Sequence, residues 1–313
     1  MALRIVVIGQ AAFGEQVLTG LLARGHDVVA VYCPPDTPAR PDALAAATRA
    51  ASVSCRQPPS YKPELVRAEV AALAPDLLIL AYVTQIVPLA LAEVPRLGSI
   101  CFHPSLLPRH RGGSAINWAL IEGDHETGVS VFWVDAGIDT GPLLAQRRIP
   151  IDADDSAGAL YYARIVPAGV ALVLESVALI EEGTAPRLVQ DERYATYEPL
   201  CRDVHARIDW SRPAAKVHDL IRGCDPQPGA FTIAGTSQLR LYDSRRADAA
   251  ATADAAATAP GAILACDAGG LVVAAAGGAV RLGKARLEET RDKKPAAEVI
   301  AALGRGVGDH LGV

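Results

Sequence analysis

The chain has 313 residues, half of them hydrophobic, with 30 Lys and Arg against 35 Asp and Glu. A chain of this length and apolar content can bury a sizeable core, which excludes disorder over its whole length and suggests about two domains. The net charge of −5 argues against a general binder of nucleic acids or anionic membranes.

The six cysteines are scattered without a CxxC pair, so neither a zinc ribbon nor a thioredoxin-like site is indicated. Scattered thiols in a chain of this size are typical of a reducing compartment. The opening residues MALRIVVIGQ are too short an apolar run for a signal peptide. No charge-free apolar run reaches the roughly 18 residues that a membrane span needs. We therefore expect a cytoplasmic α/β protein that does not cross a membrane.

The first half of the chain alternates short β-branched runs with segments of helical periodicity. Strands are expected at residues 3–9, 26–33, 76–82, 98–103, 128–135 and 143–150, and helices at 13–24, 41–51, 61–74, 114–122 and 156–183. Ser156 is the expected N-cap of the last helix, and Pro167 is expected to kink or break it. This alternation predicts a Rossmann-like, doubly wound α/β sheet, which we assign to a catalytic domain of residues 1–184.

The second half has a different pattern. Residues 185–204 are polar and irregular and are predicted to be a linker. In the domain of residues 205–313, a helix is expected at about 213–223, with strands near 229–234, 238–243, 261–266, 271–276 and 279–287. Short strands at this close spacing predict a small β-barrel or sandwich. The Ala-rich residues 247–259 are expected to form a surface loop, although Ala also favours helices.

The first strand ends at Gly9, and Gly14 follows five residues later. A dinucleotide-binding fingerprint needs a third glycine, and a phosphate-binding P-loop needs Gly-Lys-Ser/Thr, which is also missing. We therefore predict an ordinary strand-to-helix turn here rather than an NAD(P) site, although the fold class alone would suggest one.

Two other strand ends carry residues with suitable chemistry. His103 opens the loop HPSLLPRHRGG at the end of the strand 98–103, and Asp135 and Asp139 lie in WVDAGIDTG after the next strand. Ligands of open α/β sheets bind beyond the carboxyl ends of the strands, and His exchanges protons near neutral pH. An acid here could orient the His or act on a water. A hydrogen-bonded core His and an ordinary Asp/Gly turn are the alternatives, and spacing does not choose between the two acids.

The stretch HPSLLPRHRGGSAINWALIEGD, followed by TGV and DAGIDTGPLL, resembles the signature of 10-formyltetrahydrofolate-dependent formyltransferases. The segments IVVIGQAAFGEQV, VPRLGSICFHPSLLPRHRG and RIDWSRPAAKVHDLIRGCDPQPGAF are similar, more narrowly, to the N-terminal hydrolase domain of 10-formyltetrahydrofolate dehydrogenase. The resemblance covers nearly the whole chain. It implies the formyltransferase fold followed by a smaller, OB-like C-terminal β-barrel, similar to that of methionyl-tRNA formyltransferase.

The resemblance also implies roles for individual residues. His103 and Asp139 match the catalytic His and Asp of the family, and Cys101 occupies the place, two residues before the His, where the family usually has Asn. The hydrolase domain also lacks this Asn. The positions that match the surroundings of the pteridine ring and the formyl group are Tyr82, Gln85, Ile86, Pro88, Ser105, Leu106, Leu107, Arg109, Asp135 and Gly137.

By this resemblance the protein is an enzyme that hydrolyses 10-formyltetrahydrofolate to tetrahydrofolate and formate, without a metal or NAD(P). His103 would stabilise the oxyanion, and Asp139 would deprotonate the attacking water or amine. A thiol is a weaker donor than an amide, and losing one oxyanion donor costs about 2.7–4 kcal/mol, so either another group compensates or turnover is slow. The departure from Asn at residue 101 favours the hydrolase branch over efficient transfer to an amine.

Formyl transfer to methionyl-tRNA, an amino sugar or an amino acid is the alternative function. The tRNA is not favoured, since residues 206–313 carry only a small positive charge. A non-catalytic folate-binding module and a nicotinamide oxidoreductase are less well supported. The 313 residues include no carrier or aldehyde-dehydrogenase domain, so NADP-dependent oxidation is not expected. The sequence does not predict an oligomeric state.

Overall fold

The structure is a computed structural model that describes residues 2–36 and 41–312. The chain packs into two compact units. Unit 1 consists of Met1–Gly113, Thr127–Ile149 and Ala163–Glu198, and unit 2 of Ser114–Glu126, Pro150–Tyr162 and Pro199–Val313. Two short segments of the predicted catalytic domain, residues 114–126 and 150–162, therefore pack in unit 2. Residues 185–198 of the predicted linker pack in unit 1. The contiguous domains and the linker drawn from the sequence stay a prediction.

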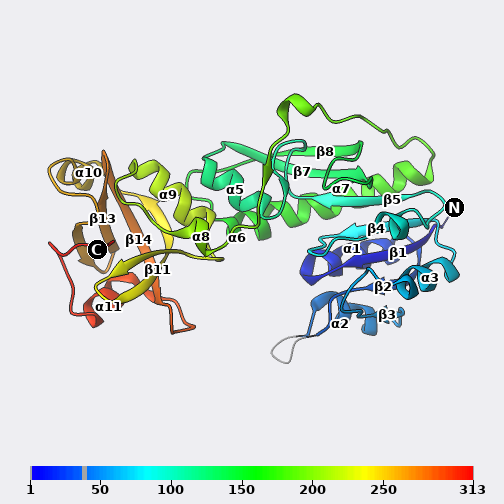
Figure 1. The fold of residues 1–313 in the computed structure, drawn as a ribbon, viewed down its shortest axis with the longest axis horizontal. Coiled ribbons are helices and arrows are strands. Elements are labelled where there is room, and N and C mark those ends of the chain that lie inside the picture. Colours follow the sequence, from blue (N-terminus) through cyan, green and yellow to red (C-terminus); the bar gives the residue numbers. More distant parts are fainter. Residues whose placement is uncertain (1, 37–40, 313) are drawn as a thin grey trace. The chain divides into compact units, whose positions relative to one another are not determined.

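Unit 1 is built on a seven-stranded sheet with the order β3-β2-β1-β4-β5-β7-β8 (Figure 1). The strands are β1 (Arg4–Gly9), β2 (Asp27–Tyr32), β3 (Cys55–Arg56), β4 (Leu77–Ala81), β5 (Ser99–His103), β7 (Glu126–Trp133) and β8 (Leu143–Pro150). The pairs from β3 to β5 are parallel, and β5 pairs with β7 in the antiparallel direction. The predicted α/β class is confirmed, with a sheet that is mostly parallel.

Helices cover both faces of this sheet. They are α1 (Ala11–Ala23), α2 (Ala43–Ala50), α3 (Glu64–Ala72), α4 (Leu89–Ala92) and α7 (Val166–Glu181). Successive strand residues point to opposite faces. On one face Ile8 of β1 shares a core with Val66 and Val70 of α3. On the other face the Phe102 ring of β5 stacks on Phe13 of α1, with 4.0 Å between ring centroids. This two-sided cover is the doubly wound arrangement expected from the sequence.

The long helical stretch predicted at 156–183 consists of α6 (Ala157–Leu160), a π-helical turn (Tyr161–Ile165) and α7. Ser156 caps it by accepting a hydrogen bond from the backbone N–H of Ala159 at 3.2 Å. Residues 157–181 are long and apolar enough to cross a membrane by composition alone, with a mean hydropathy of 1.9 over an 18-residue window. Gly169 packs so closely on Phe102 and Phe13 that a side chain there would overlap both rings. We therefore interpret α7 as a core helix of unit 1.

Unit 2 contains a six-stranded antiparallel sheet. Its strands are β10 (Ala230–Ala234), β11 (Ser237–Arg246), β14 (Gly278–Leu287), β13 (Gly270–Ala275) and β12 (Ile263–Asp267) in that order, with β15 (Lys294–Pro295) paired to β14. The helices are α5 (Ala115–Glu122), α8 (Asp203–Ala206), α9 (Ala214–Gly223), α10 (Ala249–Ala256) and α11 (Ala296–Ala302). Among the described residues no pairing joins the outer strands β10 and β12. The sheet is open, so the expected closed barrel is not found. The spacing of strands along the sequence does not show whether the first and last strands of a sheet pair with each other.

The Ala-rich segment 247–259 is not a loop, contrary to the expectation. Residues Ala249–Ala256 form α10, and the Asp248 side chain caps it by accepting from the backbone N–H of Ala251 at 2.9 Å. Ala255 packs in a small core with Val272 of β13. The high helix propensity of Ala, an N-cap and an apolar contact together outweigh the loop-like low complexity.

Candidate active site

The strand β5 ends at the candidate catalytic residues. Cys101 and His103 are two positions apart and therefore face the same side of the sheet, opposite to Phe102. His103 is the last residue of β5 and is buried. Its strand lies between β4 and β7, so the His sits at the central part of the sheet edge. This is the edge where open α/β sheets bind their ligands.

His103 and Asp139 form the central pair of the site. His103 Nδ1 lies 3.5 Å from Asp139 Oδ2, and His103 Nε2 lies 2.7 Å from the carbonyl oxygen of His110. Because a carbonyl oxygen only accepts hydrogen bonds, the donor in this bond is the Nε2–H of His103. The other ring nitrogen, Nδ1, faces the Asp139 carboxylate. Asp139 Oδ2 also accepts from the backbone N–H of Gly112 at 2.8 Å. The orientation of both side chains is thus fixed by backbone groups.

Cys101 adds a neutral thiol beside this pair. Burial raises the pKa of the Cys101 thiol well above its usual value, and the Asp139 carboxylate raises it further. The thiol therefore stays protonated at neutral pH, with its sulfur 3.5 Å from the carbonyl oxygen of Phe102. Cys101 can supply a weak S–H donor, whereas a nucleophilic role would need a thiolate.

The turn from Asp135 to Thr140 presents Asp139 to the His. Asp135 Oδ1 accepts from the Thr140 hydroxyl at 2.6 Å and from the backbone N–H of Gly137 at 3.0 Å. A side chain at Gly137 would overlap Thr140. Asp135 and Gly137 therefore shape the turn, and Asp139, with φ +58°, is the acid that faces His103. The structure makes the choice between the two acids that the spacing left open.

The loop that follows His103 is held by internal bonds. The Ser105 hydroxyl donates to the carbonyl oxygen of Arg109 at 2.6 Å, and the Ser105 carbonyl oxygen accepts from Ser130 at 2.6 Å. Leu107 is buried, Leu106 is half-buried and Arg109 is exposed. Ser105 and Leu107 thus maintain the loop conformation. A contact of these four residues with a substrate stays a prediction.

Residues 82–88 contain four of the positions predicted to surround the pteridine ring. This segment begins where β4 ends, next to β5. Tyr82 follows β4 directly with φ +64°, and its ring centroid lies 6.3 Å from that of Phe13. Gln85 and Pro88 are half-buried, and Ile86 is 68 % exposed. The carboxyl ends of the parallel strands β4 and β5 bring this segment to the same edge as His103. Its predicted role in holding the pteridine ring stays a prediction.

Residues of the expected linker support the pair, and the sequence reasoning missed them. The strand β9 (Tyr197–Glu198) pairs in parallel with β6 (Arg111–Gly112). Thr196 Oγ1 accepts from the backbone N–H of His110 at 2.8 Å, and Gln190 Nε2 donates to the carbonyl oxygen of Asp139 at 2.9 Å. These partners are 86 and 51 positions apart in the sequence, so no local motif marks them.

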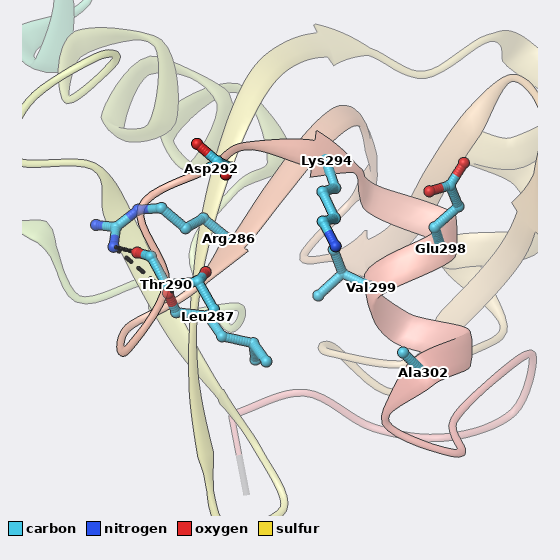
Figure 2. A pocket seen from close by; sticks show the side chains of 8 residues that line it. All are labelled: Arg286, Leu287, Thr290, Asp292, Lys294, Glu298, Val299 and Ala302. Atoms are coloured by element: carbon cyan, nitrogen blue, oxygen red, sulfur yellow. Dashed lines mark hydrogen bonds between the residues drawn. The ribbon is translucent and has the colours of Figure 1, made fainter.

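Two further features of the described chain do not add to this site. Among the described residues no group of three or more His, Cys, Asp or Glu could hold a metal ion. A cavity of about 270 Å³ lies in unit 2 between the end of β14 and α11 (Figure 2). The side chains that line it carry charges of both signs, and Arg286 donates a hydrogen bond to the carbonyl oxygen of Thr290 at 2.5 Å. The candidate catalytic residues are not part of it.

Two family models match this chain. "Formyl transferase" matches residues 3–177, and "Formyl transferase, C-terminal domain" matches residues 202–301. The chain belongs to the formyl transferase family. It is an enzyme of this family, and the resemblance seen in the motifs around His103 and Asp139 is confirmed.

Curated relatives come from two branches. The chain is 41% identical over 248 residues to cytosolic 10-formyltetrahydrofolate dehydrogenase of Homo sapiens, covering 77% of this chain and 27% of that protein. It thus spans about a quarter of the length of the dehydrogenases that it matches. It is 38% identical over 291 residues to methionyl-tRNA formyltransferase of Pseudomonas putida (strain W619), covering 91% of each chain.

Solved structures share the fold at lower sequence identity. HypX from Aquifex aeolicus in complex with tetrahydrofolic acid has a TM-score of 0.72 and 20% identity, with 98% of this chain and 48% of that chain covered. WlaRD, a sugar 3N-formyl transferase, has a TM-score of 0.69 and 16% identity, with 93% of this chain and 100% of that chain covered. The formyltransferase fold expected from the sequence is therefore present.

Proposed function

We propose that this protein hydrolyses 10-formyltetrahydrofolate to tetrahydrofolate and formate in the cytoplasm. The observation that carries the proposal is the His103–Asp139 pair, 3.5 Å apart, with Cys101 on the same face of β5. The substrate is supported by the names of the dehydrogenase relatives and by the tetrahydrofolic acid bound to HypX. The location is supported by six cysteines that are all free thiols, as in a reducing compartment.

The reaction begins with the addition of water to the formyl carbon. Asp139 accepts a proton from the water as the C–O bond forms, and the electron pair of the C=O bond moves to the formyl oxygen. Asp139 Oδ1 suits this role because it has no hydrogen bond among the described residues, whereas Oδ2 is held by Gly112. Collapse of the intermediate restores the C=O bond and breaks the C–N10 bond, and N10 takes the proton that Asp139 accepted. Tetrahydrofolate leaves together with formic acid, which ionises to formate.

His103 stabilises the oxyanion of the intermediate in this proposal. Its Nε2–H donates to the carbonyl oxygen of His110 in this structure, so the substrate oxygen must replace that carbonyl as acceptor. Catalytic hydrogen bonds often align only in the substrate complex. These steps use only side chains and water, with no metal and no NAD(P).

Cys101 favours hydrolysis over transfer. An Asn amide would donate a strong hydrogen bond to the oxyanion, and the neutral Cys101 thiol donates a weak one. Removing such a donor costs about 2.7–4 kcal/mol of transition-state stabilisation, so turnover is expected to be slow. A slow reaction suits the hydrolytic regulation of a folate pool better than the supply of formyl groups to an acceptor.

Formyl transfer to an amine is the second candidate. It is favoured by the match to methionyl-tRNA formyltransferase, which covers 91% of both chains. An amine of a tRNA, an amino sugar or an amino acid would then take the place of water, and Asp139 would accept its proton.

The test is tetrahydrofolate release from 10-formyltetrahydrofolate in the absence of any amine. We expect release by the wild type and a loss of at least about 100-fold in both His103→Ala and Asp139→Ala. His125→Ala, at an exposed position, is the matched control and should retain wild-type activity. Folate binding without release would overturn hydrolysis and direct a screen of amines, beginning with methionyl-tRNA.

Cys101→Asn separates the two candidates further. The amide restores the usual donor, so we expect the ratio of transfer to hydrolysis to rise when an amine is supplied. An unchanged ratio would show that residue 101 does not set the balance between water and an amine.

A further inference from the structure

We propose that Gln190 is a positioning residue that fixes Asp139 against His103. Gln190 lies outside the helices and strands, after α7, and only 4% of it is exposed. A buried amide in an irregular segment needs partners for all its polar groups. The kinetic part of this inference rests on the proposed function, and its structural part does not.

The Gln190 side chain joins the two loops that carry the catalytic pair. Its Nε2 donates to the carbonyl oxygen of Asp139 at 2.9 Å and to that of Gly141 at 2.7 Å. Its Oε1 accepts from Arg111 Nη2 at 2.8 Å and from Arg111 Nε at 3.2 Å. Both donors and both acceptor positions of the amide are therefore used.

Asp139 is a residue whose backbone needs support. Its φ of +58° lies in the left-handed region, which non-glycine residues adopt only when their surroundings hold them there. One amide binds the carbonyl groups on both sides of Thr140, at Asp139 and Gly141. This fixes the backbone that directs the Asp139 carboxylate towards His103 Nδ1.

Arg111 supplies the other end of the connection. It is fully buried and lies between His110, whose carbonyl holds His103, and Gly112, whose N–H holds Asp139. Its guanidinium also donates to Glu192 at 2.6 Å. The bond between Arg111 and Gln190 therefore ties the loop after β5 to the loop after β7. A misplacement of about 1 Å between catalytic groups can cost about 100-fold in rate.

The chemistry of the amide is specific. In Gln190→Glu the side chain keeps its size and its attraction to Arg111. The carboxylate, however, would face the carbonyl oxygens of Asp139 and Gly141, which also only accept. Gln190→Asn keeps the amide but is one methylene shorter, so it cannot reach both loops. Gln57→Glu is the matched control, since Gln57 is an amide of unit 1 that donates to the carbonyl oxygen of Pro34 at 2.8 Å.

The kinetic test compares kcat and KM for 10-formyltetrahydrofolate among the three variants and the wild type. We expect Gln190→Glu and Gln190→Asn to lower kcat about tenfold or more with KM within about threefold, and Gln57→Glu to change neither. In an Asp139→Asn background, Gln190→Glu should cost little more, because the group it positions is already gone. Equal losses in the two backgrounds, or an unchanged kcat, would overturn the proposal.

A second readout does not need turnover. The imidazole nitrogen signals of His103, assigned with His103→Gln in ¹⁵N-His-labelled protein, report the contact with Asp139. We expect Gln190→Glu to move them towards those of Asp139→Asn, while Gln57→Glu leaves them in place. Unmoved signals in a folded Gln190→Glu protein would overturn the proposal, even if the wild type proved inactive on folate. If Gln190→Glu does not fold, Gln190→Asn gives the same comparison.

Discussion

His103 is held by the main chain of His110, with 2.7 Å between His103 Nε2 and the carbonyl oxygen. Residue 110 has φ +55°, so the carbonyl is aimed by a left-handed backbone. The ring of His110 has a separate contact, with Nδ1 3.2 Å from Glu198 Oε1. The backbone conformation of residue 110 and the identity of its side chain therefore have separable effects.

Two substitutions at residue 110 make this separation measurable. His110→Gly and His110→Val both delete the imidazole and its contact with Glu198, but only glycine adopts a positive φ without strain. Left-handed backbone costs an L-residue roughly 1–2 kcal/mol, and more when it is β-branched. We expect His110→Gly to retain more tetrahydrofolate release and more stability to urea than His110→Val. Equal values for the two variants would show that the backbone geometry is not what matters.

Gly141 is predicted to accept no side chain. A Cβ there would overlap the carbonyl oxygen of Trp133, and strand backbone cannot rotate away as a side chain could. We expect Gly141→Ala to lower the free energy of unfolding by about 1–3 kcal/mol or more, and to reduce activity through the Asp139 turn. Gly306→Ala is the control, because no atom lies within 4 Å of its Cβ position. Denaturant unfolding of both variants checks this, and equal stabilities would contradict it.

The thiols are predicted to differ in reactivity near neutral pH. A hydrogen bond from the Cys224 thiol lowers the pKa of Cys201, whereas burial raises the pKa of Cys101 and of Cys266. Thiolates are the reactive form, so iodoacetamide at pH 7.5 should modify Cys201 before Cys101 and Cys266. Mass spectrometry of peptides over time measures the order. Early modification of Cys101 would show that its thiol is not held neutral by burial.

The burial of His218 predicts that the folded protein loses stability at acid pH. It is buried in unit 2, where Nε2 donates to the carbonyl oxygen of Ala153 at 2.9 Å and Nδ1 accepts from Ser244 at 2.8 Å. Burial lowers its pKa below the ordinary 6.5. As the pH falls through about 6.5, the unfolded chain takes up the proton first, so the folded state loses stability below that pH and keeps it above.

His218→Gln removes this titration while retaining hydrogen-bonding groups. It should be less stable than the wild type at pH 8, and the difference in thermal midpoint should narrow towards pH 5. A difference that stays constant over this range would mean that His218 does not contribute to the pH dependence.

Most helices and strands were predictable because their signals are local. Apolar runs and turn residues placed β1, β4 and β5 within about two residues of their observed bounds, and helical periodicity placed α1 and α9. The prediction for residues 247–259 was wrong because composition was weighed above helix propensity. The catalytic candidates were predictable for a similar reason, since His103 and Asp139 each lie in an unbroken, family-specific motif.

The sequence by itself thus determined the order of the elements, the α/β class and the motifs at two strand ends. Only the tertiary structure decided that Asp139 faces His103 while Asp135 caps a turn. It also decided that the sheet of unit 2 stays open and that Gln190 joins the two catalytic loops. The physical reason is distance along the chain: Gln190 bonds residues 51 and 79 positions away. Backbone propensity and periodicity act over a few residues, whereas these bonds depend on how the whole chain packs.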